Sequence, residues 1–393
     1  MINSNQFLKE DFRTGKSKKI LFVISEDWYF ISHRLFLAKY AISQGFEVSL
    51  LTNVTKYQKH IESCGINLIN WDIKRRSANI FTEIKSIMIL LKAIKKIHPD
   101  IIHAVGLKPI LYGAVSAKLR RVHIRIFAFA GLGYVFSSTQ YLARLLRPFI
   151  ILIMKVLLKN RYSTLIMQNK DDAKVFIKKN IVKKSQIKII KGAGVDTEIF
   201  SGSINSSKTP IVLLPARLLK DKGVEDFFRT AEILKNQGIN ARFVIAGRED
   251  PSNPEAVDKE SLAKLSESNV VEFWGHVDNM ANAFKKSSII CLPSFREGLP
   301  KALLEAASCE KPIVTYDVPG CREVVINNLN GFLVNFRKIN ELAAAIQKLL
   351  LDESLRISMG KAGRDLVLKE FSQEKIAKQT ESIWLSKINI PNR

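Results

Sequence analysis

Residues 288–314 read "SIICLPSFREGLPKALLEAASCEKPIV", and this stretch indicates the fold. Its apolar start, "SIICLPS", lacks polar alternation, which is typical of a strand buried on both faces. Pro300 suits the first turn of a helix, because the N–H that proline lacks would have no partner there, and residues 302–307 continue the helix. The next apolar run, "PIVTYDV", begins at Pro312. This order predicts parallel strands joined by helices.

Similar apolar runs alternate with helix-like segments along the chain, in two successive sets. Before residue 191 the runs are "ILFVIS", "EVSLLT", "INLINW", "DIIHAV", "IRIFAFAG", "STLIMQ" and "IKII". After residue 210 they are "IVLLPA", "ARFVIAG", "VVEFWG", "SIICLPS", "PIVTYDV" and "GFLV". Residues 191–210 are rich in Gly, Ser and Pro, which marks a linker. We therefore predict an α/β protein with two Rossmann-like doubly wound parallel-sheet domains that face each other across a cleft.

We place the first domain at residues 1–200 and the second at 201–372. Residues 373–393 form a C-terminal helix in this prediction, one that could cross back to the first domain. Residues 83–96 have helical periodicity, with an apolar stripe made of Ile84, Ile87, Met88, Leu91 and Ile94.

The composition is that of a globular protein. The 393 residues, 47% hydrophobic and 25% charged, suffice for two domains with full-sized cores. Four scattered cysteines without a Cys-x-x-Cys pair argue against a disulfide framework or a zinc site and favour a reducing compartment. The polar N-terminal segment lacks a signal-peptide core, and the apolar run at residues 148–158 is too short to cross a bilayer. We expect a cytoplasmic protein.

Positive charge is concentrated in the first half. The formal net charge is +21 for residues 1–200 and +3 for residues 201–393. Between Asp100 and Asp171 there is no acidic side chain, whereas eleven Lys or Arg residues lie there. A stretch of one sign favours an anionic partner, which could be lipid headgroups, a diphosphate or nucleic acid.

Two carboxylates flank the helix start of the opening stretch. Glu297 precedes Gly298, which lets the backbone approach a ligand, and the free N–H groups of the helix start favour a phosphate there. Glu305, about two turns into the helix, can accept hydrogen bonds from hydroxyls of the same ligand. Alternatively, Glu305 pairs with Lys301 on a solvated face and Glu297 is an ordinary loop charge.

A second turn in the same domain carries two cations. Arg217 directly follows a predicted strand, and Lys222 directly precedes a predicted helix. The two side chains could neutralise a diphosphate, because Arg offers a planar fork and Lys a point charge. Alternatively, residues 220–222 are only a solvated loop.

The second half resembles a known family. The motifs are, in order, "GAGVDTEIF", "ARLLKDKG", "FVIAG", "EFWGHVDNM", "LPSFREGLPKALLEAASCEKPIV" and "VPGCREVV". Together they resemble the retaining glycosyltransferases of family 4, whose fold is called GT-B. The resemblance implies a nucleotide-sugar donor held by the second domain without a metal. By motif, Glu297 would contact the transferred sugar and Glu305 the ribose. The diphosphate would meet Arg217, Lys222 and the backbone of Gly298, Leu299 and Pro300.

The first half resembles the family less closely. Many relatives have two glycines after the first strand, but this chain continues with "SEDWYFISHRLFLA", so Trp28, His33 and Arg34 would take over part of their task. Many relatives also carry a histidine in the loop after the strand that corresponds to "IRIFAFAG". This chain has Phe129, Ala130 and Gly131 there instead. We expect His33, Arg34 and Gly131 to face the acceptor.

Two further residues follow from the strand "DIIHAV". His103 ends that strand in our prediction and is the best placed histidine for contact with donor or acceptor, so we group it with Arg217, Lys222 and Glu297 as catalytic. Lys108 could meet an acceptor phosphate. Alternatively, His103 is a satisfied histidine at a strand end and Lys108 a plain loop lysine.

The stretches "DWYFISHR", "GLKPILYGA" and "GLGYVF" resemble a bacterial branch of the family. That branch extends undecaprenyl-diphosphate-linked sugars, often with an N-acetylhexosamine, which implies a UDP-sugar donor and no metal or other cofactor. The acid-free basic stretch suits a protein that lies on the anionic inner face of the cytoplasmic membrane. Alternatively, "RLLRPFIILIMKVLLK" is only a core helix with a solvated basic side.

Two other functions remain open at this point. A nucleotide-sugar epimerase or a phosphorylase can share the two-domain fold, and the basic half would suit a nucleic-acid-binding protein. The chain shows no recognisable nucleic-acid-binding module, and its basic residues are not interleaved with aromatic stacking platforms. We expect no nucleic-acid partner.

Overall fold

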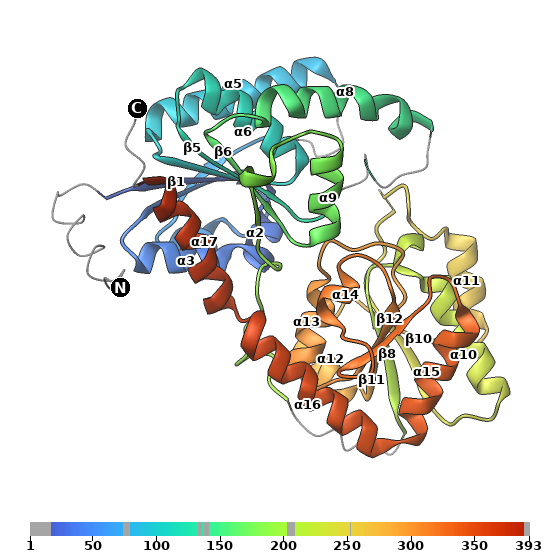
Figure 1. The fold of residues 1–393 in the computed structure, drawn as a ribbon. Coiled ribbons are helices and arrows are strands. Elements are labelled where there is room, and N and C mark those ends of the chain that lie inside the picture. The colour runs from blue at the N-terminus through green and yellow to red at the C-terminus, as the bar shows by residue number, and fades with distance from the viewer. Residues whose placement is uncertain are drawn as a thin grey trace. The chain divides into compact units, whose positions relative to one another are not determined.

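The structure is a computed structural model that describes residues 17–73, 79–132, 136, 141–202, 209–251 and 253–388. It divides into two compact units (Figure 1). The first consists of Met1–Ile190 with Ala377–Arg393, and the second of Lys191–Ile376. The division thus falls at residue 190, earlier than the predicted residue 200. The last helix, α17 (Gln373–Ile388), begins in the second unit and ends in the first.

The first unit is built on a parallel sheet, and each predicted apolar run of the first half forms one of its strands. Among the described residues the strand order is β3-β2-β1-β4-β5-β6-β7. β4 and β6 are buried at every residue, as expected for strands covered on both faces. The strands are β1 (Lys19–Glu26), β2 (Glu47–Asn53), β3 (Asn67–Asn70), β4 (Ile101–Val105), β5 (Ile124–Phe129), β6 (Ser163–Met167) and β7 (Ile187–Ile189).

Helices cover both faces of this sheet (Figure 1). α6 packs against β1, β4 and β5 and has α5 and α8 as neighbours, whereas α3 and α17 lie on the opposite face. The helices are α2 (Asp27–His33), α3 (Leu35–Ser43), α4 (Gln58–Ser63), α5 (Ile80–Ile97), α6 (Leu107–Leu119), α8 (Tyr141–Leu158), α9 (Lys170–Lys178) and the short η2 (Lys184–Gln186). No helix in the described parts of the chain combines the length and the apolarity needed to cross a membrane.

α5 does not bury the stripe that the sequence predicts. Its buried residues are Ser86, Leu90, Ala93, Ile94 and Ile97. Of the predicted stripe only Ile94 is among them, while Ile84 and Met88 are 50% and 51% exposed. The helix has apolar side chains on two sides, so periodicity alone could not identify the side that faces the core.

The second unit repeats the plan with a parallel sheet of order β10-β9-β8-β11-β12-β13 in the described residues. Here too each predicted run is a strand: β8 (Ile211–Pro215), β9 (Arg242–Ala246), β10 (Glu272–Gly275), β11 (Ile289–Leu292), β12 (Ile313–Tyr316) and β13 (Gly331–Val334). The helices are η3 (Lys220–Lys222), α10 (Val224–Asn236), α11 (Lys259–Glu267), α12 (Met280–Lys286), α13 (Lys301–Ser308), α14 (Cys321–Val324), α15 (Ile339–Leu351) and α16 (Glu353–Glu370). The four cysteines of the chain are free thiols in this structure.

Each sheet reverses its winding direction at one point. In the first sheet this point lies between β1 and β4, and in the second between β8 and β11. Open α/β sheets bind ligands beyond the carboxyl ends of the strands at such a point. In the second unit, the segments that leave these two strands contain all the predicted donor-binding residues.

Candidate active site

Two connections meet at the carboxyl edge of the second sheet. One leads from β8 through η3 to α10, and the other from β11 to α13. The backbone N–H of Phe295 donates to the carbonyl of Asp221 at 2.8 Å. Gly223 has φ of 72°, and a Cβ at this position would lie 2.0 Å from the carbonyl oxygen of Pro293. Only glycine therefore lets the two connections approach each other this closely.

Lys222 and Glu297 form an ion pair between these connections. The Lys222 Nζ lies 2.5 Å from Oε1 of Glu297, and the Ser294 hydroxyl donates to the same oxygen at 2.8 Å. Burial disfavours the charged form of Lys222, but the charge and hydrogen bond of Glu297 outweigh it and raise the pKa of Lys222. Burial also raises the pKa of the neighbouring Asp221, against the effect of Lys222. Lys222 is therefore a fixed cation at neutral pH.

Arg217 lies at the same sheet edge but has another partner. Its Nη1 donates to Oδ2 of Asp250, in the segment after β9, at 2.7 Å. The positive charge of the guanidinium is close enough to act on both Asp221 and Lys222, where it opposes the net rise of each pKa. The structure thus brings the two predicted cations into one electrostatic environment, each with a carboxylate partner.

The start of α13 lacks a side-chain cap. Pro300 is the N-cap residue and makes no side-chain cap hydrogen bond, whereas the sequence predicted this proline in the first helical turn. Gly320, with φ of 85°, supports the preceding loop, because a Cβ there would lie 2.6 Å from the carbonyl oxygen of Glu297 and 2.7 Å from that of Gly298. Leu299, which follows Gly298 in this loop, is buried. This helix start is suited to an anion.

Glu305 pairs with Lys301, but not on a solvated face. Its carboxylate lies 2.8 Å from the Lys301 Nζ, and the residue is 9% exposed. Burial raises the pKa of Glu305, and the Lys301 charge opposes this effect only in part. The alternative proposed from the sequence is therefore right about the pair and wrong about its surroundings. The Lys301 pair therefore offsets only part of the cost of burying this carboxylate, and hydrogen bonds from a ligand would offset more of it.

In the first unit, β1 runs directly into α2. Asp27 at the helix start is buried and accepts hydrogen bonds from the backbone and the hydroxyl of Thr55. Burial would raise the pKa of Asp27, but these hydrogen bonds lower it below its usual value. His33 ends α2 and is half-buried. Arg34 follows it, is 6% exposed, and its Nε has no hydrogen-bond partner among the described residues.

The sequence suggested that His103 ends a strand, but the structure shows otherwise. This residue lies inside β4 and is 1% exposed. The indole N–H of Trp384, on α17, donates to its Nδ1 at 3.3 Å, and Phe22 stacks on its ring at 5.1 Å. Burial, together with the charge of Arg34, lowers the pKa of His103 to about 3, so the ring is neutral. The alternative that the sequence left open, a satisfied histidine at a strand end, is also only partly right, because His103 is a core residue whose buried Nε2 has no hydrogen-bond partner among the described residues. This burial argues against the catalytic assignment.

The other acceptor candidates lie at the carboxyl edge of the first sheet. Lys108 is on the first turn of α6, not in a loop, and its Nζ lies 2.8 Å from a carboxylate oxygen of Glu83 on α5. Gly131 lies two residues after the end of β5, with φ of 117°. Trp28, on α2, is half-buried. Glu83 thus neutralises Lys108.

Comparisons with known proteins identify the chain. Residues 195–366 match the family described as "Glycosyl transferases group 1", and residues 19–169 match "Glycosyl transferase 4-like". Over 328 residues the chain is 30% identical to the N,N'-diacetylbacillosaminyl-diphospho-undecaprenol alpha-1,3-N-acetylgalactosaminyltransferase of Campylobacter jejuni. That alignment covers 80% of this chain and 85% of the relative. The chain belongs to the group 1 glycosyltransferases.

Other relatives agree. The glycosyltransferase is 25% identical to the UDP-Gal:alpha-D-GlcNAc-diphosphoundecaprenol alpha-1,3-galactosyltransferase of Escherichia coli, with 80% of this chain and 82% of the relative aligned. Among solved structures, sucrose-phosphate synthase from Thermosynechococcus elongatus superposes with a TM-score of 0.78 at 20% identity, over 94% of this chain and 99% of that one. Anabaena HepE, solved with UDP, gives 0.76 at 16% identity, over 94% and 100%. The fold of this glycosyltransferase is GT-B.

Four residues of the glycosyltransferase that support the donor-side candidates were not identified from the sequence. They are Gly223, Asp250, Ser294 and Gly320. Gly320 lies in "VPGCREVV", which contributed to the resemblance but received no role. Asp250 gave no sequence signal, because its pairing with Arg217 depends on the adjacency of β8 and β9.

Proposed function

We propose that this glycosyltransferase moves an N-acetylhexosamine from a UDP-sugar to a lipid-diphosphate-linked saccharide, in the synthesis of an O-antigen, capsule or other glycan. The transfer retains the anomeric configuration and uses no metal. The names of the relatives support both substrate classes: one names a UDP-sugar donor, and two name diphosphate-linked undecaprenol acceptors. The observation that carries the proposal is the Lys222–Glu297 pair beside the uncapped start of α13.

The donor diphosphate would bind at this helix start. Lys222 uses one N–H to bond Glu297, and its ammonium has two more donors for a phosphate. Arg217 likewise bonds Asp250 through Nη1 and has further N–H groups to offer. Together with the positive end of α13, these cations stabilise the charge that grows on the leaving diphosphate, a form of preorganised electrostatic catalysis.

The carboxylates would hold the two sugars of the donor. Lys222 and Ser294 both bond Oε1 of Glu297, so Oε2 is the oxygen that can accept a hydrogen bond from a hydroxyl of the transferred sugar. Glu305 would accept hydrogen bonds from the ribose. Such bonds would compensate the cost of keeping this carboxylate buried.

The transfer step follows from these roles. The bond between C1 of the sugar and the phosphate oxygen breaks, and the acceptor hydroxyl oxygen bonds C1 on the same face. The acceptor proton passes to the departing phosphate oxygen, so no enzymic base is required. This route agrees with the placement of His103 in the core, since its ring is inaccessible to substrate.

We further propose that the first unit lies on the inner face of the cytoplasmic membrane through α8. The exposed side of this helix is apolar: Leu145, Leu146, Phe149, Leu152, Ile153 and Val156 are each 45–64% exposed. They fall on one side of the helix, while Met154 and Leu158 are the fully buried residues within its described side chains, 144–158. Arg144 and Lys155 lie along one flank of the apolar side. A helix of this pattern binds anionic lipid by interfacial burial and charge attraction.

One experiment tests the proposed reaction. The purified protein is incubated with a panel of UDP- and GDP-sugars and polyprenyl-diphosphate saccharides, and the lipid product is analysed by mass spectrometry. We expect extension by one N-acetylhexosamine with a UDP donor. Isomerised UDP-sugar without acceptor would instead indicate an epimerase.

A further inference from the structure

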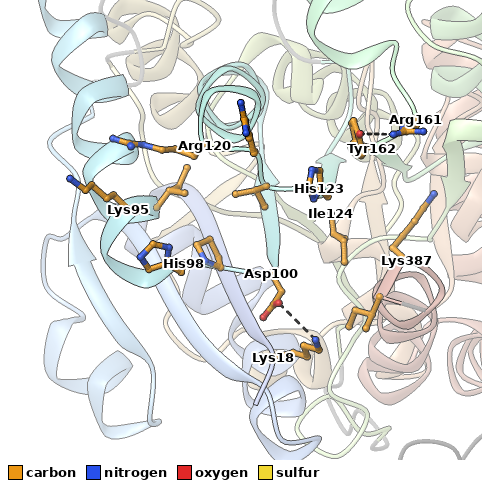
Figure 2. Close-up of a pocket in the computed structure, with 15 residues that line it drawn as sticks. Lys18, Lys95, His98, Asp100, Arg120, His123, Ile124, Arg161, Tyr162 and Lys387 are labelled. Atoms are coloured by element: carbon orange, nitrogen blue, oxygen red, sulfur yellow. Dashed lines mark hydrogen bonds and ion pairs between the residues drawn. The ribbon is translucent and has the colours of Figure 1, made fainter. Parts of the chain in front are cut away.

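A cavity of about 1070 Å³ opens at the amino-terminal edge of the first sheet (Figure 2). Its lining comes from the starts of β1, β4 and β5, the ends of α5, α6 and α17, and the segment between α8 and β6. The predicted acceptor residues follow β1, β4 and β5 at the opposite, carboxyl edge. The cavity therefore shares no residue with either predicted substrate site.

The lining of this cavity is strongly cationic. It holds six Lys or Arg side chains and two histidines, His98 and His123, against a single carboxylate, Asp100. One oxygen of Asp100 accepts from the backbone N–H of Lys19 at 2.8 Å, and the other lies 4.0 Å from the Lys18 Nζ. The cations are Lys18, Lys95, Arg120, Arg121, Arg161 and Lys387.

Helix ends explain only part of this charge. α5 and α6 end at the cavity, where His98 and Arg120 are their C-cap residues, and cations are favoured beside the negative end of a helix. Each helix end is equivalent to about half a negative charge. The C-terminal ends of α5, α6 and α17 and the carboxylate of Asp100 together offset about two and a half of the six positive charges, so a clear excess remains. A concave surface of one sign focuses the field on an oppositely charged ligand.

Part of the lining is already held in place. Arg161 donates a hydrogen bond to the hydroxyl of Tyr162 at 2.8 Å, which Figure 2 marks with a dashed line. Its guanidinium lies 4.9 Å from the centre of the Tyr162 ring. The rings of His123 and Tyr162 also pack against each other, with centroids 5.1 Å apart. A guanidinium positioned in this way loses less side-chain entropy when it binds an anion.

We propose that this cavity is a second anion site, for a ligand with clustered phosphate groups. The ligand chemistry has two sources, a free diphosphate compound or the headgroup of an anionic lipid. A lipid headgroup is one of the two sources because Arg161 and Tyr162 of the lining follow α8, the helix that we propose lies on the membrane. The site lies in the first unit and does not depend on the proposed transfer reaction.

Histidine-selective NMR tests the site directly, because the chain contains only six histidines. His98 and His123 line the cavity, whereas His60 and His276 lie elsewhere and serve as internal references. Single His→Gln variants assign the signals. Sodium pyrophosphate is titrated in one arm, water-soluble dibutanoyl-phosphatidylglycerol in the second, and sodium chloride of equal ionic strength in the third.

We expect saturable shifts of His98 and His123 alone, in the pyrophosphate arm for a free ligand or in the lipid arm for a headgroup. Arg120→Gln with Arg121→Gln should weaken this binding by about tenfold or more, whereas the exposed pair Lys39→Gln with Lys59→Gln should not. Equal shifts in sodium chloride, no shift in either ligand arm, or full affinity in the Arg120/Arg121 variant would each overturn the proposal. Sugar transfer is not measured, so failure here leaves the proposed function intact.

Discussion

Lys222 and Glu297, 75 positions apart in the chain, lie 2.5 Å apart between two connections of the second sheet. The pair is mostly buried, with side chains 18% and 13% exposed. Ser294 and the glycines at 223 and 320 hold its surroundings, and the uncapped start of α13 adjoins it. The pair joins a cation suited to phosphate to a carboxylate suited to a sugar hydroxyl.

Removal of a phosphate-binding cation should slow transfer. We expect Lys222→Ala or Arg217→Ala to lower turnover by about 100-fold or more, as with the loss of one preorganised donor to a developing anion. Lys220→Ala is the matched control, because this lysine lies in the same 3-10 turn with a side chain 49% exposed and bonded only loosely to Asp258 at 3.9 Å. Near wild-type turnover of both variants on a confirmed substrate would remove the diphosphate assignment.

Glu305→Gln should separate stability from donor binding. Burial raises the folded-state pKa of Glu305 above its unfolded value of 4.5, so the proton-linked stability is full below pH 4.5 and is lost as the pH rises through the folded pKa. The variant should therefore melt at a higher temperature than wild type at pH 7, and the difference should shrink as the pH approaches 4.5. Its KM for the UDP-sugar should rise, since the ribose loses a charged acceptor.

Glu260→Gln is the control for this variant. Glu260 and Lys264 form an i,i+4 pair of the same 2.8 Å length, but it is exposed. Its loss should change the melting temperature little at any pH. A lower melting temperature for Glu305→Gln at pH 7 would contradict the account of this carboxylate.

Gly320→Ala should disturb the loop before α13. Its Cβ would meet the carbonyl oxygens of Glu297 and Gly298, and its φ of 85° is strained for alanine, a cost of about 1–3 kcal/mol. Gly238→Ala carries a similar φ of 76° but meets no atom within 4 Å. Denaturant unfolding should show a larger loss for Gly320→Ala, and only this variant should lower kcat/KM. Equal effects of the two would show that the loop contact is unimportant.

The apolar side of α8 should determine lipid binding. Phe149→Asp with Leu152→Asp should reduce co-sedimentation with phosphatidylglycerol vesicles by about tenfold, while activity on a short-chain soluble acceptor persists. Leu351→Asp, at an exposed leucine on α15 of the second unit, is the control and should bind vesicles normally. Unchanged sedimentation of the α8 variant would refute the proposed membrane contact.

All thirteen predicted strands are present, because runs such as "DIIHAV" are apolar on both sides and suit only the interior of a parallel sheet. The donor-side candidates also came from the sequence, since they lie on short connections next to recognisable motifs. Contacts between distant segments could not be foreseen. The burial of His103 could not be foreseen because it involves Trp384, 281 positions away in the chain. Asp250 was missed because only the sheet order brings it to Arg217. The prediction of the buried stripe of α5 was wrong for a related reason, because the sequence does not say which side of this helix packs against α6.

The most direct test of the central claim is the structure of the lipid product formed in the presence of EDTA. The UDP-N-acetylhexosamine and polyprenyl-diphosphate saccharide selected from the panel are incubated with the protein, and the product is analysed by mass spectrometry and NMR of its anomeric proton. We predict an acceptor extended by one N-acetylhexosamine, with the anomeric configuration of the donor. An inverted linkage, a product that forms only when metal is restored, or a UDP-sugar that is isomerised without transfer would contradict the account.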